Sequence, residues 1–378
     1  MSYVYRVAEQ ALRRYLNVFP VVGLTGPRQS GKSTLLQHVL PEYGYVTFDD
    51  PKNILSFKED PEGFLKNYSE KIIFDEVQYV PELFNYIKIK VDQRRSFYGN
   101  FVLTGSSQFQ FLHHVTESLA GRIGLMSLLP FQYAEMPMPR LPESIFRGSY
   151  PELVMRNYLE SDLWFASYIE TYLSKDVRAI ANVGDIHDFR RFLQLLAARA
   201  TQLLDMSSFS RDIGVSVPTI KKWLSILEAS YIIFIVPPFY ENHGKRIVKS
   251  PKVYFYDTGL ISYFTGITTF DQYDKGPMAG SLFENYVVSE IVKKELHTAT
   301  LSEVFYFRTQ DKVEIDLIVD RKSSRDYIEI KKTATFHPKL VQAIKKYADP
   351  RENCFLLYTG EVFQYGDVKI MPYWDYLD

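Results

Sequence analysis

The chain has 378 residues, of which 24% are charged and 46% hydrophobic, and its formal net charge is −1. This length allows two or three domains with their own cores, and the balanced charge excludes a protein that binds polyanions through its overall charge, so any contact with nucleic acid needs a local basic patch. Cys354 is the only cysteine, which excludes an internal disulfide and a cysteine-based zinc site.

The first stretch, Met1 to Asn17, carries three arginines on a helical pattern and has no apolar core segment, so it does not read as a secretory signal. No apolar run approaches the roughly 20 residues of a membrane-spanning helix. We therefore expect a soluble, cytoplasmic protein without a membrane partner.

A phosphate-binding loop is predicted next, because an apolar run at 21–24 leads into the pattern G-x-x-x-x-G-K-S and then into a helix. Glycines let successive backbone N–H groups face one anion, and the helix N-terminus adds partial positive charge. Lys32 would bridge the β- and γ-phosphates of ATP, and the Ser33 hydroxyl would ligate Mg²⁺. The predicted ATP-binding residues are Gly26, Pro27, Arg28, Gln29, Ser30, Gly31, Lys32, Ser33 and Thr34.

Two adjacent carboxylates follow the apolar segment at 71–74, after a short strand predicted at 45–48. A buried parallel strand delivers such residues to the crevice at its carboxyl end. Asp75 would hold Mg²⁺ through water, and Glu76 would orient the attacking water, as phosphoryl transfer requires. A hydrolase needs this adjacent glutamate, whereas a kinase does not.

A further strand at 101–104 ends in small residues and hydroxyls, which favours a sensor of the γ-phosphate, with Ser106 preferred to Thr104. Arg122 lies between glycines after this strand. It is placed to reach a phosphate of its own or a neighbouring subunit as an arginine finger, or else to cap a surface helix.

The motifs GPRQSGKST, IIFDEVQYVP, VLTGSS and SLAGR, in this order, resemble the bacterial and archaeal AAA-type ATPases fused to a C-terminal domain of unknown function. Further matches to that family are YIETYLSKDVR, SPKVYFYDTG and an E…D…ExK set, so the resemblance covers nearly the whole chain. It implies an ASCE-type P-loop NTPase fold with a parallel sheet, Mg-ATP hydrolysis and a homo-oligomer such as a hexameric ring. It also makes Lys32, Asp75, Glu76 and Arg122 the catalytic candidates, while Arg28 fits the GPRQ pattern, where it would reach a phosphate or fix the base of the loop.

A proline-rich stretch at 136–142 marks a linker. Beyond it, the segments 161–177 and 188–202 have helical apolar spacing, which predicts a helical lid or connector.

Residues 207–227 look like a helix-turn-helix, with Gly214 at the turn and Pro218 in the first turn of the second helix. Segments 231–236 and 252–256 would form a wing. From Phe209 to Lys252 seven basic residues stand against three acidic ones, a local excess of +4. The predicted DNA-contacting residues are Thr219, Lys221, Lys222, Arg246 and Lys249. Winged helices also dock proteins, so both interpretations stay open.

The last third carries a helical Glu284, a strand with Asp316, and a Glu-x-Lys made by Glu329 and Lys331 on the next strand, which together resemble the PD-(D/E)xK nucleases. Residues two apart on a strand share a face, so Glu329 and Lys331 can meet Asp316. The carboxylates would bind a second divalent metal, and Lys331 would stabilise the attacking hydroxide. The same residues can instead be a salt-bridged remnant, because folds outlive their chemistry.

The sequence thus predicts an α/β protein with an AAA-type P-loop ATPase domain at 1–150, a helical lid at 151–205, a winged helix at 206–262 and a PD-(D/E)xK-like α/β domain at 263–378. The predicted function is Mg-ATP hydrolysis coupled to DNA binding or remodelling. The alternative is an ATP-gated protein-interaction switch with a silent nuclease-like scaffold and no nucleic acid.

Overall fold

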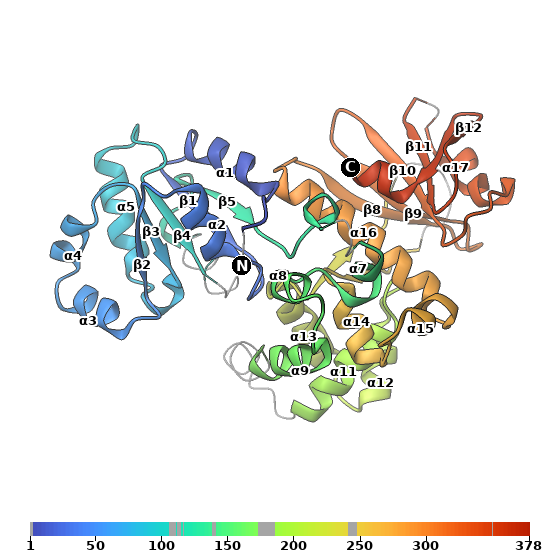
Figure 1. Cartoon of the computed structure of the whole chain (residues 1–378), viewed down its shortest axis with the longest axis horizontal. Helices are drawn as coiled ribbons and strands as arrows, with labels where there is room; N and C mark the ends of the chain where they lie inside the picture. Colours follow the sequence, from blue (N-terminus) through green and yellow to red (C-terminus); the bar gives the residue numbers. More distant parts are fainter. Residues whose placement is uncertain are drawn as a thin grey trace. The chain divides into compact units, whose positions relative to one another are not determined.

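The structure is a computed structural model (Figure 1), and it describes residues 3–105, 111, 115, 117–137, 141–172, 186–240, 248–349 and 351–378. The chain forms two compact units. The first unit contains Met1–Phe131, Ala229–Tyr231 and Leu296–Ala299, and the second contains Gln132–Glu228, Ile232–Glu295 and Thr300–Asp378. No helix among the described residues is both long and apolar enough to cross a membrane.

The first unit is built on a five-stranded parallel sheet with the order β2-β3-β4-β1-β5, drawn mostly in blue and cyan in Figure 1. The strands are β1 (Val21–Thr25), β2 (Gly44–Thr47), β3 (Ile72–Asp75), β4 (Phe101–Thr104) and β5 (Ile123–Ser127). Because all strands run the same way, their carboxyl ends meet at one edge, where ligands of such sheets bind. The predicted parallel α/β sheet is confirmed.

Helices cover both faces of this sheet, as Figure 1 shows for α2 and α5. They are α1 (Ala8–Leu16), α2 (Lys32–Val39), α3 (Pro51–Glu59), α4 (Pro61–Asn67) and α5 (Leu83–Gln93). Side chains alternate along each strand, so Ile73 packs into one apolar cluster while Ile72 and Phe74 pack into the other. Burial on both faces explains why β1, β3 and β4 are entirely buried.

The second unit begins with helices, as the spacing predicted. They are α7 (Leu141–Arg147), α8 (Pro151–Met155), α9 (Ser161–Tyr172), α11 (Ile186–Ala198), α12 (Met206–Ile213) and α13 (Val217–Ala229). Gly214 ends α12 in the left-handed conformation with φ 89°, which is the turn expected between two such helices. Strands β6 (Ile233–Val236) and β7 (Lys252–Phe255) then pair antiparallel.

A mixed six-stranded sheet fills the last part of the second unit, drawn in orange and red in Figure 1, with the order β12-β13-β11-β10-β9-β8. Its strands are β8 (Glu303–Arg308), β9 (Glu314–Asp320), β10 (Arg325–Ile330), β11 (Asn353–Tyr358), β12 (Phe363–Tyr365) and β13 (Val368–Pro372). The α-helices that follow β7 along the chain are α14 (Thr258–Thr265), α15 (Phe270–Lys275), α16 (Ala279–His297), α17 (Gln342–Tyr347) and α18 (Tyr373–Leu377). The strands predicted around Asp316 and Glu329 are therefore neighbours, β9 and β10, in antiparallel pairing.

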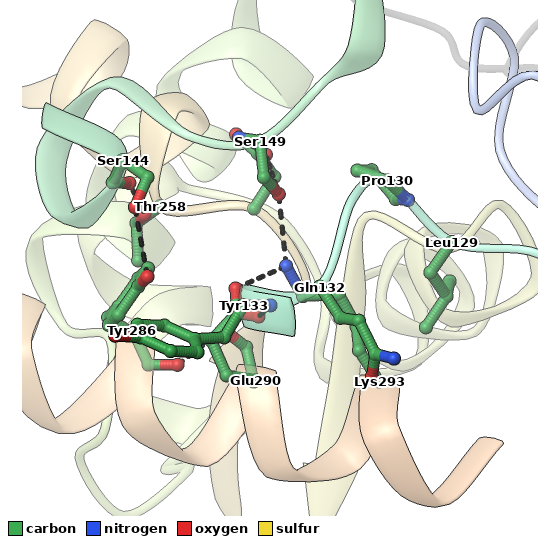
Figure 2. A network of polar contacts seen from close by, with 12 residues as sticks. Leu129, Pro130, Gln132, Tyr133, Ser144, Ser149, Thr258, Tyr286, Glu290 and Lys293 are labelled. Atoms are coloured by element: carbon green, nitrogen blue, oxygen red, sulfur yellow. Dashed lines mark hydrogen bonds and ion pairs between the residues drawn. The ribbon is translucent and has the colours of Figure 1, made fainter. Parts of the chain in front are cut away.

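A buried polar network ties α16 to the loop that precedes α8, and Figure 2 shows it at close range. Lys293 donates to Ser149 Oγ over 2.9 Å and also to Glu290, whose other oxygen accepts from the Tyr133 backbone N–H over 2.6 Å. The Asp257 carboxylate accepts from the Ser149 N–H over 2.7 Å and caps α14 through the Gly259 N–H. Asp257 is thus fixed within a packed core.

Candidate functional site

The predicted phosphate loop lies between β1 and α2, at the carboxyl edge of the parallel sheet. Gly26 has φ 143° and Gly31 has φ 93°, values that favour glycine. A Cβ at position 26 would lie 2.1 Å from the Leu128 carbonyl oxygen, so the loop can pass this backbone only without a side chain. Helix α2 starts at Lys32 directly after the loop, and its first N–H groups therefore face the same space.

The ammonium of Lys32 turns back onto the loop. It donates to the Gly26 carbonyl over 3.0 Å and to the Pro27 carbonyl over 2.8 Å, and the residue is only 7% exposed. These carbonyls supply the acceptors that a buried ammonium needs.

Two polar side chains, Ser30 and Arg6, lie buried at the phosphate loop. The Ser30 hydroxyl is buried and has no hydrogen-bond partner among the described residues, although buried polar atoms are nearly always paired. Arg6, 3% exposed, donates to the Ser30 carbonyl over 2.8 Å and to the Leu129 carbonyl over 2.7 Å. No sequence pattern pointed to Arg6, because it lies 24 residues from its partner in the loop.

Asp75 ends β3 beside the start of α2, and its carboxylate is 4% exposed. Its Oδ2 accepts from the Ser33 hydroxyl over 2.6 Å, and its Oδ1 accepts from the Glu76 N–H over 2.9 Å. A hydroxyl paired with a carboxylate at a helix N-terminus supplies the oxygen ligands that Mg²⁺ takes beside a bound phosphate, so these residues fit the expected ion. The phenol of Tyr45 also donates to Asp75 Oδ2, and sequence reasoning missed it.

Glu76 adopts φ 55°, a left-handed conformation that is uncommon outside glycine and that clusters at functional sites. Its carboxylate accepts from the side-chain amide of Gln78. That amide also lies against the sensor strand, because a Cβ on Gly105 would come within 2.4 Å of Gln78 Oε1. Glu76 is therefore held at the end of β3, next to the end of β4.

The sensor candidates differ in what the structure describes. Thr104, at the end of β4, is fully buried, and its hydroxyl has no partner among the described residues. Ser106 lies outside the described residues. Thr104 thus brings a buried hydroxyl to the carboxyl edge of the sheet, the edge at which the phosphate loop lies.

Arg122 lies at the opposite edge. It precedes β5, which runs parallel to β1, and its backbone carbonyl accepts from the N–H of Val21 at the start of β1. The length of β1, five residues, separates it from the loop by about 16 Å. Its guanidinium makes a two-pronged ion pair with Asp92, at 2.8 and 2.9 Å, and this hydrogen bonding lowers the pKa of Asp92.

The predicted DNA-contacting residues lie on and near α13. Lys221 and Lys222 are exposed, Thr219 is half-buried at the start of the helix, and Lys249 is exposed before β7. Arg246 lies outside the described residues. Lys252, which contributed to the local positive charge of the sequence, is 2% exposed and therefore adds nothing to a surface patch.

The four nuclease-like residues belong to one ion-paired cluster in the second unit. Lys331 donates to Asp316 over 2.9 Å and pairs with Glu329 over 2.7 Å. Lys252 bonds Glu284 over 3.0 Å and also pairs with Glu314. The spacing predicted the Asp316, Glu329 and Lys331 contacts, whereas it gave no sign that Lys252 would reach the same cluster.

Burial and charge act against each other in this cluster. Burial, reinforced by Asp316, raises the pKa of Glu329 well above its usual range, and burial also raises the pKa of Glu284. Burial opposes the ionisation of Asp316 too, but Lys331 and Lys252 lower its pKa. Across the described parts of the chain, no three His, Cys, Asp or Glu side chains are arranged to hold a metal ion.

Three family models match consecutive parts of the chain. An AAA domain matches residues 18–137, a domain of unknown function (DUF8612) matches 138–271, and another domain of unknown function (DUF4143) matches 279–376. The first match covers the sheet and the phosphate loop described above, and it supports an AAA-type ATPase domain.

Among solved structures, the Walker-type ATPase PABY2304 of Pyrococcus abyssi is similar with a TM-score of 0.46 and 16% identity, over 68% of this chain and 94% of that one. DnaA of Aquifex aeolicus, bound to AMPPCP, is similar with a TM-score of 0.29 and 15% identity, over 59% of this chain and 86% of that one. These scores are too low to support an inference about function.

Two curated relatives are much closer in sequence. They are the uncharacterized protein Rv2008c of Mycobacterium tuberculosis and the uncharacterized protein Mb2031c of Mycobacterium bovis. Each is 32% identical over 333 residues, which are 87% of this chain and 74% of the relative. The chain therefore belongs to one family with these mycobacterial proteins, and its first unit carries an AAA domain with the phosphate-binding loop of P-loop ATPases.

Proposed function

We propose that the first unit hydrolyses ATP with Mg²⁺. The observation that carries this proposal is the hydrogen bond between the Ser33 hydroxyl and Asp75. It lies next to Lys32, at the carboxyl edge of the sheet, where the glycine-containing loop leads into the N-terminus of α2. Lys32 would exchange its loop carbonyls for the phosphates, and Ser33 with Asp75 would hold the ion. Bound Mg²⁺ supplies neutralising charge for the phosphates.

Glu76 would orient the attacking water, because it follows Asp75 and its carboxylate is held at the same edge. Thr104, together with Ser106, would sense the γ-phosphate. The remaining loop residues other than Pro27, among them Arg28, would offer backbone N–H groups to the nucleotide.

The test separates binding from turnover. Lys32→Ala is expected to abolish ATP binding, because the loop loses the cation proposed to bridge the β- and γ-phosphates. Glu76→Gln keeps the hydrogen-bonding shape but removes the charge, so binding should persist and turnover should fall by about 10²- to 10³-fold. Calorimetric titration with ATP and a phosphate-release assay measure the two effects. Equal loss of binding in both variants would contradict the roles assigned here.

We further propose that the protein acts as a homo-oligomer and couples turnover to DNA held by the winged-helix region at 206–262. Exposed Lys221, Lys222 and Lys249 support this, and half-buried Thr219 lies on the same helix as the first two. Arg246 completes the predicted set. Contacts to phosphate make such binding weaken steeply with salt.

Linear double-stranded DNA should therefore stimulate ATP turnover at low salt and not at high salt. The double variant Lys221→Ala/Lys222→Ala should lose the stimulation while keeping the basal rate. Lys58→Ala/Lys66→Ala, which removes two exposed lysines of the first unit, is the matched control. Turnover that ignores DNA at every salt concentration would instead favour a protein-docking role.

One observation favours the second candidate function, an ATP-gated protein-interaction switch with a silent nuclease-like scaffold. Lys252 and Lys331 already occupy the carboxylates that a catalytic metal would need. Cleavage of DNA with Mg²⁺ or Mn²⁺ that disappears in Asp316→Ala and Lys331→Ala would support a nuclease. Absence of cleavage in the unsubstituted protein would support the scaffold.

A further inference from the structure

Tyr45 reaches the predicted Mg²⁺ site from a strand that carries none of the loop or carboxylate motifs. It lies on β2, the edge strand beside β3, in parallel register with Ile73. Its hydroxyl donates to Asp75 Oδ2, the same oxygen that accepts from the Ser33 hydroxyl over 2.6 Å. Two donors from different elements thus converge on one carboxylate oxygen.

The phenol is the donor in this contact, because an ionised carboxylate such as Asp75 offers only acceptor oxygens. A phenol donates a hydrogen bond to a neighbouring carboxylate, and hydrogen bonds to a charged acceptor are the stronger kind.

Packing does not explain this placement. Tyr45 is 36% exposed and, among the described residues, does not belong to either apolar cluster that packs against the parallel sheet, whereas its hydroxyl contacts Asp75, which is 4% exposed. Tyr43, two residues earlier, shows the ordinary use of a tyrosine at this edge, because its hydroxyl donates to the backbone carbonyl of Gly99 over 2.5 Å. Of these two tyrosines, Tyr45 is the one whose hydroxyl contacts a residue of the nucleotide site.

We propose that Tyr45 is a positioning residue for the Mg²⁺ that accompanies the nucleotide: its hydroxyl holds Asp75 Oδ2 against Ser33, so that hydroxyl and carboxylate are oriented before the ion enters. This inference rests on the proposed function of the first unit. Partners that orient metal ligands typically change metal affinity by 10- to 100-fold when removed.

The test uses the full chain and ADP as the probe, titrated calorimetrically with Mg²⁺ present and with the ion removed by a chelator. The unsubstituted protein should bind ADP more tightly with Mg²⁺. Tyr45→Phe should lose about tenfold of that Mg²⁺-dependent gain and leave metal-free ADP affinity unchanged. Tyr43→Phe, which loses a hydrogen bond of its own at the same edge, is the matched control and should change neither affinity.

Thermal unfolding of the same samples checks that both variants are folded. Removal of one oxygen from a partly exposed edge strand should not disturb the fold. An unchanged Mg²⁺-dependent gain in Tyr45→Phe, or an equal loss with and without the ion, would overturn the inference while leaving the ATPase proposal intact. If Mg²⁺ does not increase the affinity of the unsubstituted protein for ADP, that result would contradict both the Mg²⁺ site at Ser33 and Asp75 and the role of Tyr45. No ADP binding at all would overturn the proposed function.

Discussion

At the scale of single residues, Gly26 controls whether the phosphate loop can form. Its φ of 143° is open to glycine only, and a Cβ there would lie 2.1 Å from the Leu128 carbonyl oxygen. Gly26→Ala should therefore destabilise the first unit by about 3 kcal/mol and abolish nucleotide binding. Gly121→Ala separates the clash from the backbone strain, because φ is 74° and, apart from its chain neighbours, no atom of the described residues lies within 4 Å of where its Cβ would be. It should cost about 1 kcal/mol and leave binding intact. Urea unfolding and ADP titration measure both, and equal costs would contradict the clash.

The stability of the protein should also depend on pH through a single residue, Glu329. Burial raises its pKa well above the usual 4.5, so its contribution to stability is complete below that value and is lost as the pH rises through the folded pKa. Glu329→Gln cannot ionise. The free energy of unfolding of the unsubstituted protein should thus fall, relative to Glu329→Gln, as the pH rises from 4 to 8. Denaturant titrations across this range measure the difference, and parallel curves would show that Glu329 has an ordinary pKa.

At the scale of elements, α14 depends on a buried cap. Asp257 is 2% exposed and accepts from the Gly259 and Ser149 N–H groups, so Asp257→Ala leaves buried donors unpaired. It should cost about 3 kcal/mol in thermal unfolding of the second unit. Asp205→Ala removes an exposed cap of α12 with two similar bonds and should cost only about 1 kcal/mol. Equal costs would mean that burial adds nothing to the cap.

At the scale of the whole molecule, the position of Arg122 bears on assembly. Because it lies about 16 Å from the loop of its own chain, a catalytic role needs a loop from a second copy. Arg122→Ala and Lys32→Ala should each be inactive alone. When mixed, a random oligomer joins an intact loop to an intact arginine at about a quarter of its interfaces, so about a quarter of the normal turnover should return. Phosphate release after mixing measures it. If no activity returns, Arg122 is structural and its ion pair with Asp92 is its role.

Sequence patterns predicted the contacts that a local motif, the alternation of side chains along strands or the shared carboxyl edge of a parallel sheet determines. The loop from Gly26 to Ser33 was predicted in full, because its chemistry needs eight consecutive residues that form the turn and the helix start themselves. Asp316, Glu329 and Lys331 were also brought together as predicted, since strand periodicity fixes which residues of β9 and β10 share a face.

Only the tertiary structure showed what surrounds these motifs. Tyr45 meets Asp75, Arg6 meets Ser30, and Lys252 meets Glu284. The two residues of each pair lie 24 to 32 positions apart, on elements whose neighbours depend on sheet order and packing rather than on local spacing. The sequence by itself determined the phosphate loop and its helix, since those are local. The orientation of Asp75, the burial of Lys252 and the far edge occupied by Arg122 depend on how distant strands pair, and no short stretch of sequence encodes that.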